Sequence, residues 1–303
     1  MARSALFYKN QLGGFSTVED MSRSTGNRWY VDSGHASASD TAGFGYTPDA
    51  PAATIDYLIA GCTANNGDII YAMPGHADTV SAAAGLAIDK AGISIVGIGR
   101  GTAQPTITLD TANTATIAIT AANTTFENIH FVANFLDIAT AITLVTAPDT
   151  TFSNCRFTDT SAILNAKIWI NEEAAATSGR LTVEGCKAKA YGTANTHFIN
   201  FAGTGDGHTV KGNVLMGDWA TMCIGGAGVI TDALIDDNRI LNIVATADTC
   251  INVAATAEGI ISNNRCCGGH ATDGIVCGDM GSLENYYVDQ DTDLSGVIEP
   301  AIV

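Results

Sequence analysis

The sequence predicts an all-β solenoid, in which the chain winds through a stack of similar coils. Three observations support this: a short phrase repeats, its repeat length suits one coil, and its residue types are those of strands that turn a corner. The phrase reads apolar, polar, Asn or Gly or Asp, small, variable, apolar, and its copies begin at Phe126, Phe152, Val183, Val210, Ile235, Ile261 and Leu283. Counted from a looser copy at Ile95, the spacing is about 22 to 31 residues, a period typical of solenoids.

Each copy of the phrase predicts one corner of a β-coil. Apolar residues alternate with polar ones, as in a strand, and the third residue tolerates left-handed backbone angles. Leucine-rich repeats would need regularly spaced leucines, and helical repeats a 3.6-residue period; the sequence has neither. Equivalent residues of stacked coils lie roughly 4.8 Å apart, so third-position side chains can hydrogen-bond from coil to coil. We expect a structural ladder of this kind at Asn128, Asn154, Asp237, Asn263 and Asn285, with Asn154 and Asn263 buried at the corner.

The repeats resemble the right-handed parallel β-helix of the pectate-lyase-like superfamily, and the likeness extends over residues 28–288. The first turns of many such proteins are similar to four N-terminal segments, Trp29–Asp32, Thr47–Pro51, Ala53–Asp56 and Gly67–Gly75. The resemblance implies an all-β, single-stranded right-handed parallel β-helix. It leaves the activity open, because the superfamily contains polysaccharide lyases and hydrolases, phage tailspikes and non-enzymatic virion proteins.

We divide the chain into an N-terminal arm at residues 1–27, a β-helix domain at 28–288 and a C-terminal tail at 289–303. Helical spacing within residues 52–60 predicts a short helix that caps the first coil with Ile55, Leu58 and Ile59. Further strands are expected at Trp29–Val31, Asp68–Met73, Ile93–Ile98, Thr106–Leu109, Thr116–Thr120, Ala141–Val145, Lys167–Ile170, His197–Phe201, Met222–Ile224, Cys250–Val253 and Gly274–Val276.

Composition argues against several classes of partner. The 303 residues include 31 acidic and 14 basic side chains, a net charge of −17, which opposes binding to nucleic acid and to anionic membranes. No apolar run approaches the roughly 18 residues of a spanning helix, and the N-terminus lacks the apolar segment of a secretory signal. We therefore expect assembly in a host cytoplasm. There the eight cysteines would remain thiols. Those stacked in one register, Cys155 with Cys186 and Cys223 with Cys250, would act as small buried apolar residues.

Two polar columns flank the predicted corner and are the candidates for chemistry. The second position of the phrase supplies Glu127, Ser153, Glu184, Lys211, Asp236, Ser262 and Glu284. The fifth position supplies His130, Arg156, Lys187, Val214, Arg239, Arg265 and Tyr287. The best local cluster is Asp236, Asp237 and Arg239, but it does not match the catalytic sets of lyases or hydrolases residue by residue. We interpret the columns as solvated or inter-subunit charges, and expect no catalytic residue and no cofactor.

The tail contains alternating Asp289, Asp291 and Asp293, like the start of an EF-hand loop. Leu294 replaces the required glycine, and Pro300 stands where the bidentate glutamate should be. We therefore predict an acidic exit loop and no metal site.

The arm combines aromatic and basic residues, the mixture that carries protein–protein affinity. A frayed terminus is the alternative interpretation, but frayed tails are rarely this apolar. The predicted partner-binding residues are Arg3, Phe7, Tyr8, Lys9, Phe15 and Arg23.

These features predict a non-enzymatic phage virion structural protein, a capsid decoration or cement protein whose partner is the major capsid protein or another virion protein. We expect a homotrimer, because a prism with only 15% charged residues has faces better buried than exposed. The alternative is a tailspike-type protein that binds or depolymerises a surface carbohydrate. The short arm and only three tryptophans favour the structural interpretation.

Overall fold

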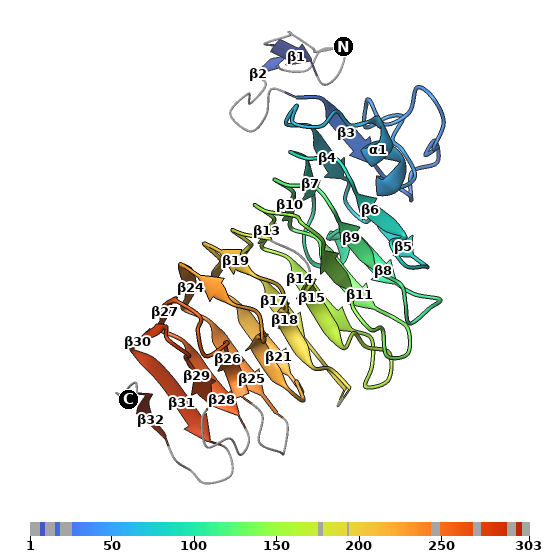
Figure 1. Cartoon of the computed structure of the whole chain (residues 1–303). Helices are drawn as coiled ribbons and strands as arrows, with labels where there is room; N and C mark the ends of the chain where they lie inside the picture. The colour runs from blue at the N-terminus through green and yellow to red at the C-terminus, as the bar shows by residue number, and fades with distance from the viewer. Residues whose placement is uncertain are drawn as a thin grey trace.

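The computed structural model shows a stack of parallel β-coils, which confirms the predicted all-β solenoid (Figure 1). The structure describes residues 26–174, 178–192, 194–243, 249–268 and 274–288, together with the backbone of Asp289 and of three further strands, β1 (Phe7–Lys9), β2 (Ser16–Val18) and β32 (Ser295–Ile298). No helix in these ranges is long and apolar enough to cross a membrane.

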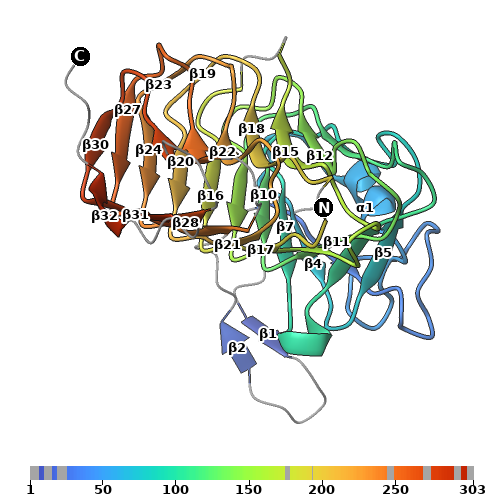
Figure 2. The same ribbon diagram turned by 90° about the horizontal axis from the view of Figure 1, so that it is seen from below.

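Three sheets form the walls of the solenoid, and Figure 2 shows them from below. The first sheet contains β3 (Arg28–Val31), β4 (Ile69–Ala72), β7 (Ser94–Gly97), β10 (Thr125–Glu127), β13 (Thr151–Ser153), β16 (Thr182–Glu184), β20 (Thr209–Lys211), β24 (Ala233–Asp236), β27 (Gly259–Ser262) and β30 (Gly281–Leu283). The second sheet contains β5 (Ala77–Val80), β8 (Thr106–Leu109), β11 (His130–Ala133), β14 (Arg156–Asp159), β17 (Lys187–Lys189), β21 (Val214–Gly217), β25 (Arg239–Asn242), β28 (Arg265–Gly268), β31 (Asn285–Asp289) and β32. The third sheet contains β6 (Leu86–Ile88), β9 (Ile117–Ile119), β12 (Ile142–Leu144), β15 (Ile168–Glu172), β18 (His197–Phe201), β22 (Met222–Gly225), β26 (Thr249–Asn252) and β29 (Ile275–Val276).

The strands expected from the sequence are all present, and neighbouring coils pair in parallel register. Among the parallel strands of the three walls, β5 and β6 were not foreseen. β5 reads Ala-Asp-Thr-Val and β6 has three residues, so neither shows enough alternation to be recognised. A 3-10 turn at Gly101–Ala103 and a small sheet of β19 (Gly205–Asp206) and β23 (Ile230–Thr231) complete the solenoid.

Inward side chains stack in register to form one continuous core. The ring centroid of Phe126 in β10 lies 5.4 Å from that of Phe152 in β13, and the angle between the two ring planes is 5°. Phe131 and Phe157 repeat this arrangement in the second sheet at 5.0 Å. All four rings are fully buried, so each contributes both apolar area and a stacking contact to the coil interface.

The corner between the first and second sheets uses the residue type that the repeat phrase predicted. Its third-position residues have φ between 51° and 65°, in the left-handed region: Asn128, Asn154, Gly185, Gly212, Asp237 and Asn263. In the last copy the corner residue is Glu284 (φ 52°), because Leu283 of β30 pairs with Ser262 of β27. The phrase at Leu283 is therefore shifted by one residue from the register that the sequence suggested.

A second corner, between the third and first sheets, was missed. Its left-handed residues are Gly92, Asn123, Asp149, Arg180, Gly207 and Asp232. The available signal was the pattern of a corner residue followed two positions later by an outward Thr, as in Asn123-Thr-Thr125 and Gly207-His-Thr209. That signal is weak, because Arg180 occupies a position that usually favours Gly, Asn or Asp.

The buried amide ladder lies one residue beyond most of the positions predicted for it. Asn154 and Asn263 are exposed, so their expected burial is wrong. Asp237 is also exposed, and Asn128 is half-buried. The Nδ2 groups of Asn128 and Asn263 do reach the neighbouring coil, at Gly97 O (2.7 Å) and Asp236 Oδ1 (2.8 Å). A left-handed corner residue points its side chain away from the core, and the next residue points inward.

The continuous ladder consists of Asn213, Asn238, Asn264 and Asn285, all fully buried. The Nδ2 groups of Asn213, Asn238 and Asn264 each donate to the Oδ1 of the next asparagine at 2.9–3.0 Å, and that of Asn285 donates to the Ser282 hydroxyl. Each Nδ2 also donates to a carbonyl of an earlier coil, and Oδ1 also accepts the backbone N–H of the preceding ladder residue. In earlier coils Cys155 and Cys186 take this inward position.

Helix α1 (Ile55–Gly61) covers the N-terminal end of the stack, as predicted (Figure 1). Ile55, Leu58 and Ile59 are buried against the first coils. Thr54 is the N-cap, and its hydroxyl accepts the Tyr57 N–H at 3.3 Å. Covering the first coil hides an edge that would otherwise pair with another chain.

All eight cysteines lie in the described ranges, and none forms a disulfide. Cys155 stacks on Cys186, and Cys223 on Cys250, as the repeat register predicted. Burial raises the pKa of the Cys155 and Cys223 thiols well above the ordinary value, so these side chains behave as small apolar residues.

Candidate functional site

The outer face of the second sheet carries two columns of outward side chains. The first column is Thr106, His130, Arg156, Lys187, Val214, Arg239, Arg265 and Tyr286, each in register with the next. This is the fifth-position column predicted from the phrase, except at its end. There the one-residue shift places Tyr286 outward, and Tyr287 packs against the core.

The second column becomes apolar toward the C-terminal end. It runs from Lys189 through Met216, Leu241 and Cys267 to Val288. Together the two columns line a groove of about 730 Å³ over β21, β25, β28 and β31. Large apolar side chains remain exposed there: Val214 and Met216 by 38%, Val288 by 41% and Tyr286 by 50%.

The charge of this surface is opposite in sign to the net charge of the whole chain. The outward positions of β14, β17, β21, β25 and β28 hold five cations and no acidic residue: Arg156, Lys187, Lys189, Arg239 and Arg265. We call these five strands and β31 the basic face. Without these five cations, the other 9 basic and 31 acidic residues of the chain have a net charge of −22. In the described ranges, neither Arg239 nor Arg265 forms an ion pair.

His130 follows Thr106 in the first column and is neutral at ordinary pH. Burial, and then the nearby Arg156 charge, lower the pKa of His130 to about 4. Its Nε2 lies 3.0 Å from the Thr158 hydroxyl of the next coil. His130 therefore braces the face, and the cationic character begins at Arg156.

An acidic corner borders the basic face, where the first sheet ends. It contains Glu184 at the end of β16, Asp236 at the end of β24, and the corner residues Asp237 and Glu284. Asn263 first, and then Ser262 and Lys211, donate to Asp236 and hold the pKa of that carboxyl below its usual value. Glu184, Asp237 and Glu284 are exposed.

The predicted cluster of Asp236, Asp237 and Arg239 is split by this corner. Asp236 is occupied by Lys211 at 3.0 Å and by two hydrogen bonds, whereas Arg239 begins β25 on the adjoining sheet. Among the described residues no carboxylate of this cluster pairs with Arg239. A hydrolytic pair at this position is not formed.

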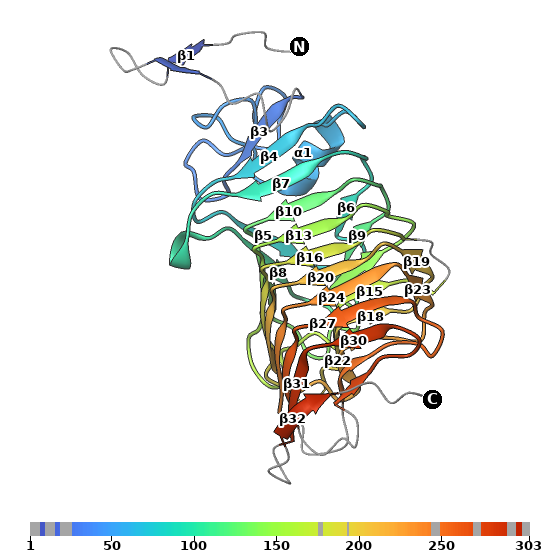
Figure 3. The same ribbon diagram turned by 90° about the vertical axis from the view of Figure 1, so that its left-hand side faces the viewer.

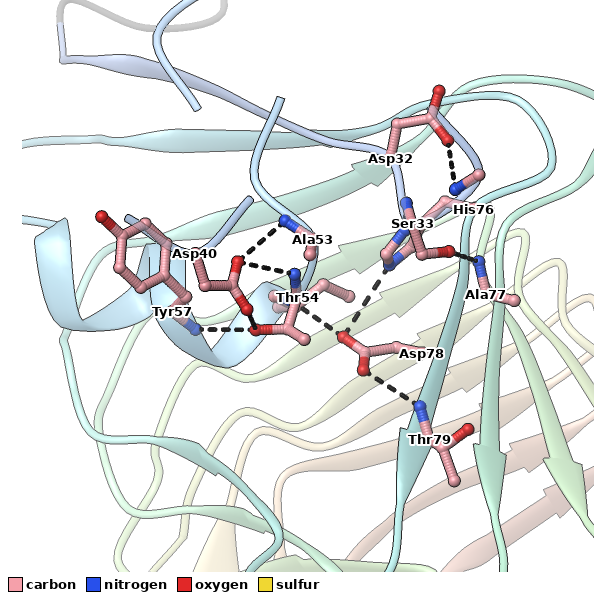
Figure 4. Close-up of polar contacts among 12 residues, drawn as sticks. Asp32, Ser33, Asp40, Ala53, Thr54, Tyr57, His76, Ala77, Asp78 and Thr79 are labelled. Atoms are coloured by element: carbon pink, nitrogen blue, oxygen red, sulfur yellow. Dashed lines mark hydrogen bonds and ion pairs between the residues drawn. The ribbon is translucent and has the colours of Figure 1, made fainter. Parts of the chain in front are cut away.

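A second polar cluster lies beside α1, where Ser33, His76 and Asp78 have the composition of a nucleophilic triad (Figure 4). The Ser33 backbone N–H donates to His76 Nδ1 at 3.0 Å, so the imidazole proton is on Nε2, 3.8 Å from Asp78 Oδ2. The Ser33 hydroxyl accepts the Ala77 N–H at 2.9 Å. Because His76 has no free acceptor nitrogen for the Ser33 proton, the cluster cannot activate a serine.

The same cluster instead fastens the N-terminal loop to the first coils. Asp78 Oδ2 accepts the Ile55 N–H at 2.9 Å at the start of α1. Asp40 accepts from the backbone N–H groups of Ala53 and Thr54 and from the Thr54 hydroxyl (Figure 4). These bonds satisfy the unpaired N–H groups of a helix start.

A third feature, a buried acid–base pair, was also not foreseen from the sequence. Glu172 and His208 are 0% and 1% exposed, with Glu172 Oε2 3.8 Å from His208 Nε2. Burial raises the pKa of Glu172 to about 7 and lowers the pKa of His208 to about 4, so both groups are neutral near pH 6. Since neither reaches solvent, the pair affects stability and not catalysis.

Other predicted residues lie partly or wholly outside the described ranges. Phe7, Tyr8 and Lys9 form β1, which pairs with β2, and only their backbone is described. Arg3, Phe15 and Arg23 lie outside, as do Asp291 and Asp293 of the acidic exit loop. Within the described part, no group of three or more His, Cys, Asp and Glu side chains is placed to hold a metal ion.

No protein-family model and no curated protein sequence matches this chain. Among solved structures it is similar to a rhamnogalacturonan lyase, with 14% identity, a TM-score of 0.42, and coverage of 91% of this chain and 66% of that one. The GH136 lacto-N-biosidase from Eubacterium ramulus has 12% identity, a TM-score of 0.45, and coverages of 86% and 67%. ORF18 of Geobacillus virus E2 has 13% identity, a TM-score of 0.33, and coverages of 86% and 61%. This chain thus spans about two thirds of the length of its neighbours, and the likeness is one of β-helix fold alone.

Proposed function

We propose that this chain is a non-enzymatic structural protein of a phage particle, a homotrimeric decoration or cement protein on the capsid. The basic face is the observation that carries the proposal. On a chain of net charge −17, an ordered wall with three arginines, two lysines and exposed apolar side chains is suited to burial against protein. The solenoid supplies a rigid support for that wall.

The proposed partner on the particle is the major capsid protein or another virion protein, reached through the arm. Aromatic and cationic side chains are concentrated in residues 1–25, away from the repeats. Their local positive charge would direct the arm toward an acidic partner surface and the acidic solenoid outward. Assembly would then take place in the host cytoplasm, and the mature location would be the virion.

Particle binding tests this function. Particles that lack the protein are mixed with full-length chain, with a chain lacking residues 1–25, and with a variant in which Phe7 and Tyr8 are both Ala. Full-length protein should sediment with the particles, and the two altered chains should remain in the supernatant. Binding should also weaken as salt is raised, because charged surfaces attract less at high ionic strength. Failure of the full-length chain to sediment would remove the proposal.

A tailspike-type carbohydrate-binding role is the second candidate, and the groove favours it. Arg239, Arg265 and Tyr286 line the groove beside exposed apolar side chains, a combination that could hold an anionic sugar chain. Calorimetric titration with uronate oligosaccharides tests this role. Heat of binding that disappears in Arg239→Ser, together with release of reducing ends, would favour a depolymerising tailspike over the structural protein.

A further inference from the structure

We infer that the basic face is the contact between copies of this chain, and that it receives the acidic corner of the next copy. This rests on the homotrimer in the proposed function and specifies which surfaces form it. The acidic corner is Glu184, Asp236, Asp237 and Glu284, as defined above. Asp236 already pairs with Lys211 at 3.0 Å, so the exposed carboxylates of Glu184, Asp237 and Glu284 are those that meet the next copy.

Charge determines which surface of a second copy can occupy the basic face. A symmetric contact between two basic faces would place Arg239 and Arg265 of both copies together, with no acidic residue on the strands to separate them. Like charges in a desolvated contact are unfavourable. The rest of the chain is strongly acidic, so an unlike surface of the second copy is favoured and the contact is heterologous.

The acidic corner suits this role because its repeat length equals that of the basic face. Both surfaces advance by one coil at a time, roughly 4.8 Å. Asp237 and Arg239 lie on the same coil, and Glu284 lies on the coil of Tyr286. Glu184 likewise lies on the coil of Lys187, whereas the corner on the coil of Arg265 carries Ser262 and Asn263 and Glu284 lies one coil beyond Arg265. Two copies standing side by side can therefore match acid to cation at the coils of Lys187 and Arg239 without a shift along the axis, and Glu284 can reach Arg265 across one coil.

The positions of the two surfaces also favour a closed ring. The acidic corner and the basic face adjoin, because β24 passes through Asp237 directly into β25. Figure 3 shows the first sheet running along the stack beside the second-sheet strands β5, β8 and β31. A copy that meets its two partners through neighbouring surfaces rotates at each step, and repeated rotation closes a ring. Opposite surfaces would instead build an open array.

The groove provides the apolar part of the contact. Met216 and Val288 are 38% and 41% exposed, and the groove volume is about 730 Å³. Side chains of a neighbouring corner can enter a space of this size. Burying the apolar column supplies affinity, and the charges specify orientation.

A charge-swap series tests the contact by light scattering on the full chain. Wild type should have a mass of about 94 kDa, three times 31.2 kDa. Reversing the charge of the basic face with Arg239→Glu and Arg265→Glu should produce monomers. Reversing the charge of the acidic corner with Asp237→Lys and Glu284→Lys should also produce monomers. The chain with all four changes should regain the trimer, because acid and cation have exchanged places. Arg180, at φ 58°, shows that a corner position accepts a long basic side chain.

Two controls keep the result interpretable. Asp232→Lys with Glu258→Lys makes the same charge change at the other corner, where both residues are exposed, and should leave the trimer intact. Met216→Glu places a charge in the apolar part of the second column. It weakens the apolar contact and should also dissociate the trimer. Circular dichroism checks that each variant is folded.

Several outcomes would overturn the inference. These are a monomeric wild type, a trimer that survives the face reversal, dissociation by the Asp232 and Glu258 control, or failure of the fourfold variant to reassociate. Particle sedimentation remains a separate measure of the proposed function. A trimer insensitive to these charges would leave the virion role standing and reject only this contact.

Discussion

At the scale of single residues, the side chain that follows the first corner points inward. It determines whether the backbone N–H and C=O groups of the stacked corners are hydrogen-bonded. Asn264 is fully buried, donates to Ile235 O at 2.8 Å and accepts two bonds from Asn238. Asn263, one residue earlier, is exposed and occupies the left-handed corner. Two adjacent asparagines thus have different roles because only one side chain points into the stack.

Replacing Asn264 with Leu should therefore be strongly destabilising. It leaves Ile235 O without its side-chain donor and the Asn238 N–H without its acceptor, at about 1–3 kcal/mol for each buried group. Asn263→Gly is the matched control, since glycine accepts a φ of 54° without strain. Urea unfolding measures both. Equal midpoints for the two variants would contradict the ladder assignment.

The buried Glu172 and His208 affect stability with opposite pH dependence. The folded-state pKa of Glu172 is raised to about 7, so its contribution is complete below about pH 4.5 and is lost as pH rises toward 7. The folded-state pKa of His208 is lowered to about 4, so its contribution is complete above about pH 6.5 and is lost as pH falls. Between these limits the two slopes oppose each other.

Glu172→Gln should remove the contribution to stability that decreases as pH rises and leave the contribution of His208. The free energy of unfolding of the variant, relative to wild type, should increase as pH rises from 4.5 to 7, by about 1.4 kcal/mol for each unit of pKa shift removed. Urea unfolding at pH 4.5, 5.5 and 7 measures this. A difference that stays constant with pH would show that the pKa of Glu172 is not raised in the folded state.

At the scale of elements, α1 ends the solenoid at its N-terminal side. Ile55, Leu58 and Ile59 face the first coils, and Asp40, Thr54 and Asp78 satisfy the N–H groups around its first turn. The helix has seven residues, so it depends on these contacts and not on intrinsic helix formation. Because α1 acts as a cap, we expect substitutions on its buried side to lower both the stability and the solubility of the protein.

Leu58→Ala should cost about 2–5 kcal/mol, the usual cost of such a truncation in a closed core. Loosening the cap also exposes the first coil, so the variant should associate end to end on warming. Thermal unfolding followed by light scattering detects both effects. Ala60→Ser, on the exposed side of α1, is the control and should retain the wild-type midpoint and remain unaggregated.

At the scale of the whole molecule, the solenoid is stabilised by contacts between neighbouring coils. Strands β1 and β2 of the arm pair only with each other in the described chain. Asn27, by contrast, already belongs to the solenoid, because its N–H donates to Asp68 at 2.7 Å. The solenoid therefore includes Asn27, which the sequence had assigned to the arm.

Deleting residues 1–25 should leave the thermal midpoint of the solenoid unchanged, since it removes no contact between coils. Differential scanning calorimetry of the full and shortened chains measures this. Deletion of residues 1–31, which also removes β3, should lower the midpoint by comparison. A lowered midpoint in the shorter deletion would show that the arm packs on the solenoid.

Local sequence determined the coils, corners and cap. Strand alternation and left-handed residue types act over a few residues, so repeats from Phe126 to Asn263 predicted the first corner, and Ile55, Leu58 and Ile59 predicted α1. The basic column was likewise visible as a fifth position, up to the shift at Tyr286.

Only the tertiary structure decided which side chains meet. Whether Asn263 or Asn264 is buried in the ladder depends on the direction in which the corner turns. The sequence of two adjacent asparagines does not reveal that direction. Glu172 and His208 are far apart in sequence and replace apolar residues of other coils, so their contact follows from the stacking register. The basic face next to an acidic corner is also a property of the stack: residues with alternating charges along the chain become separate columns once each coil is placed on the last.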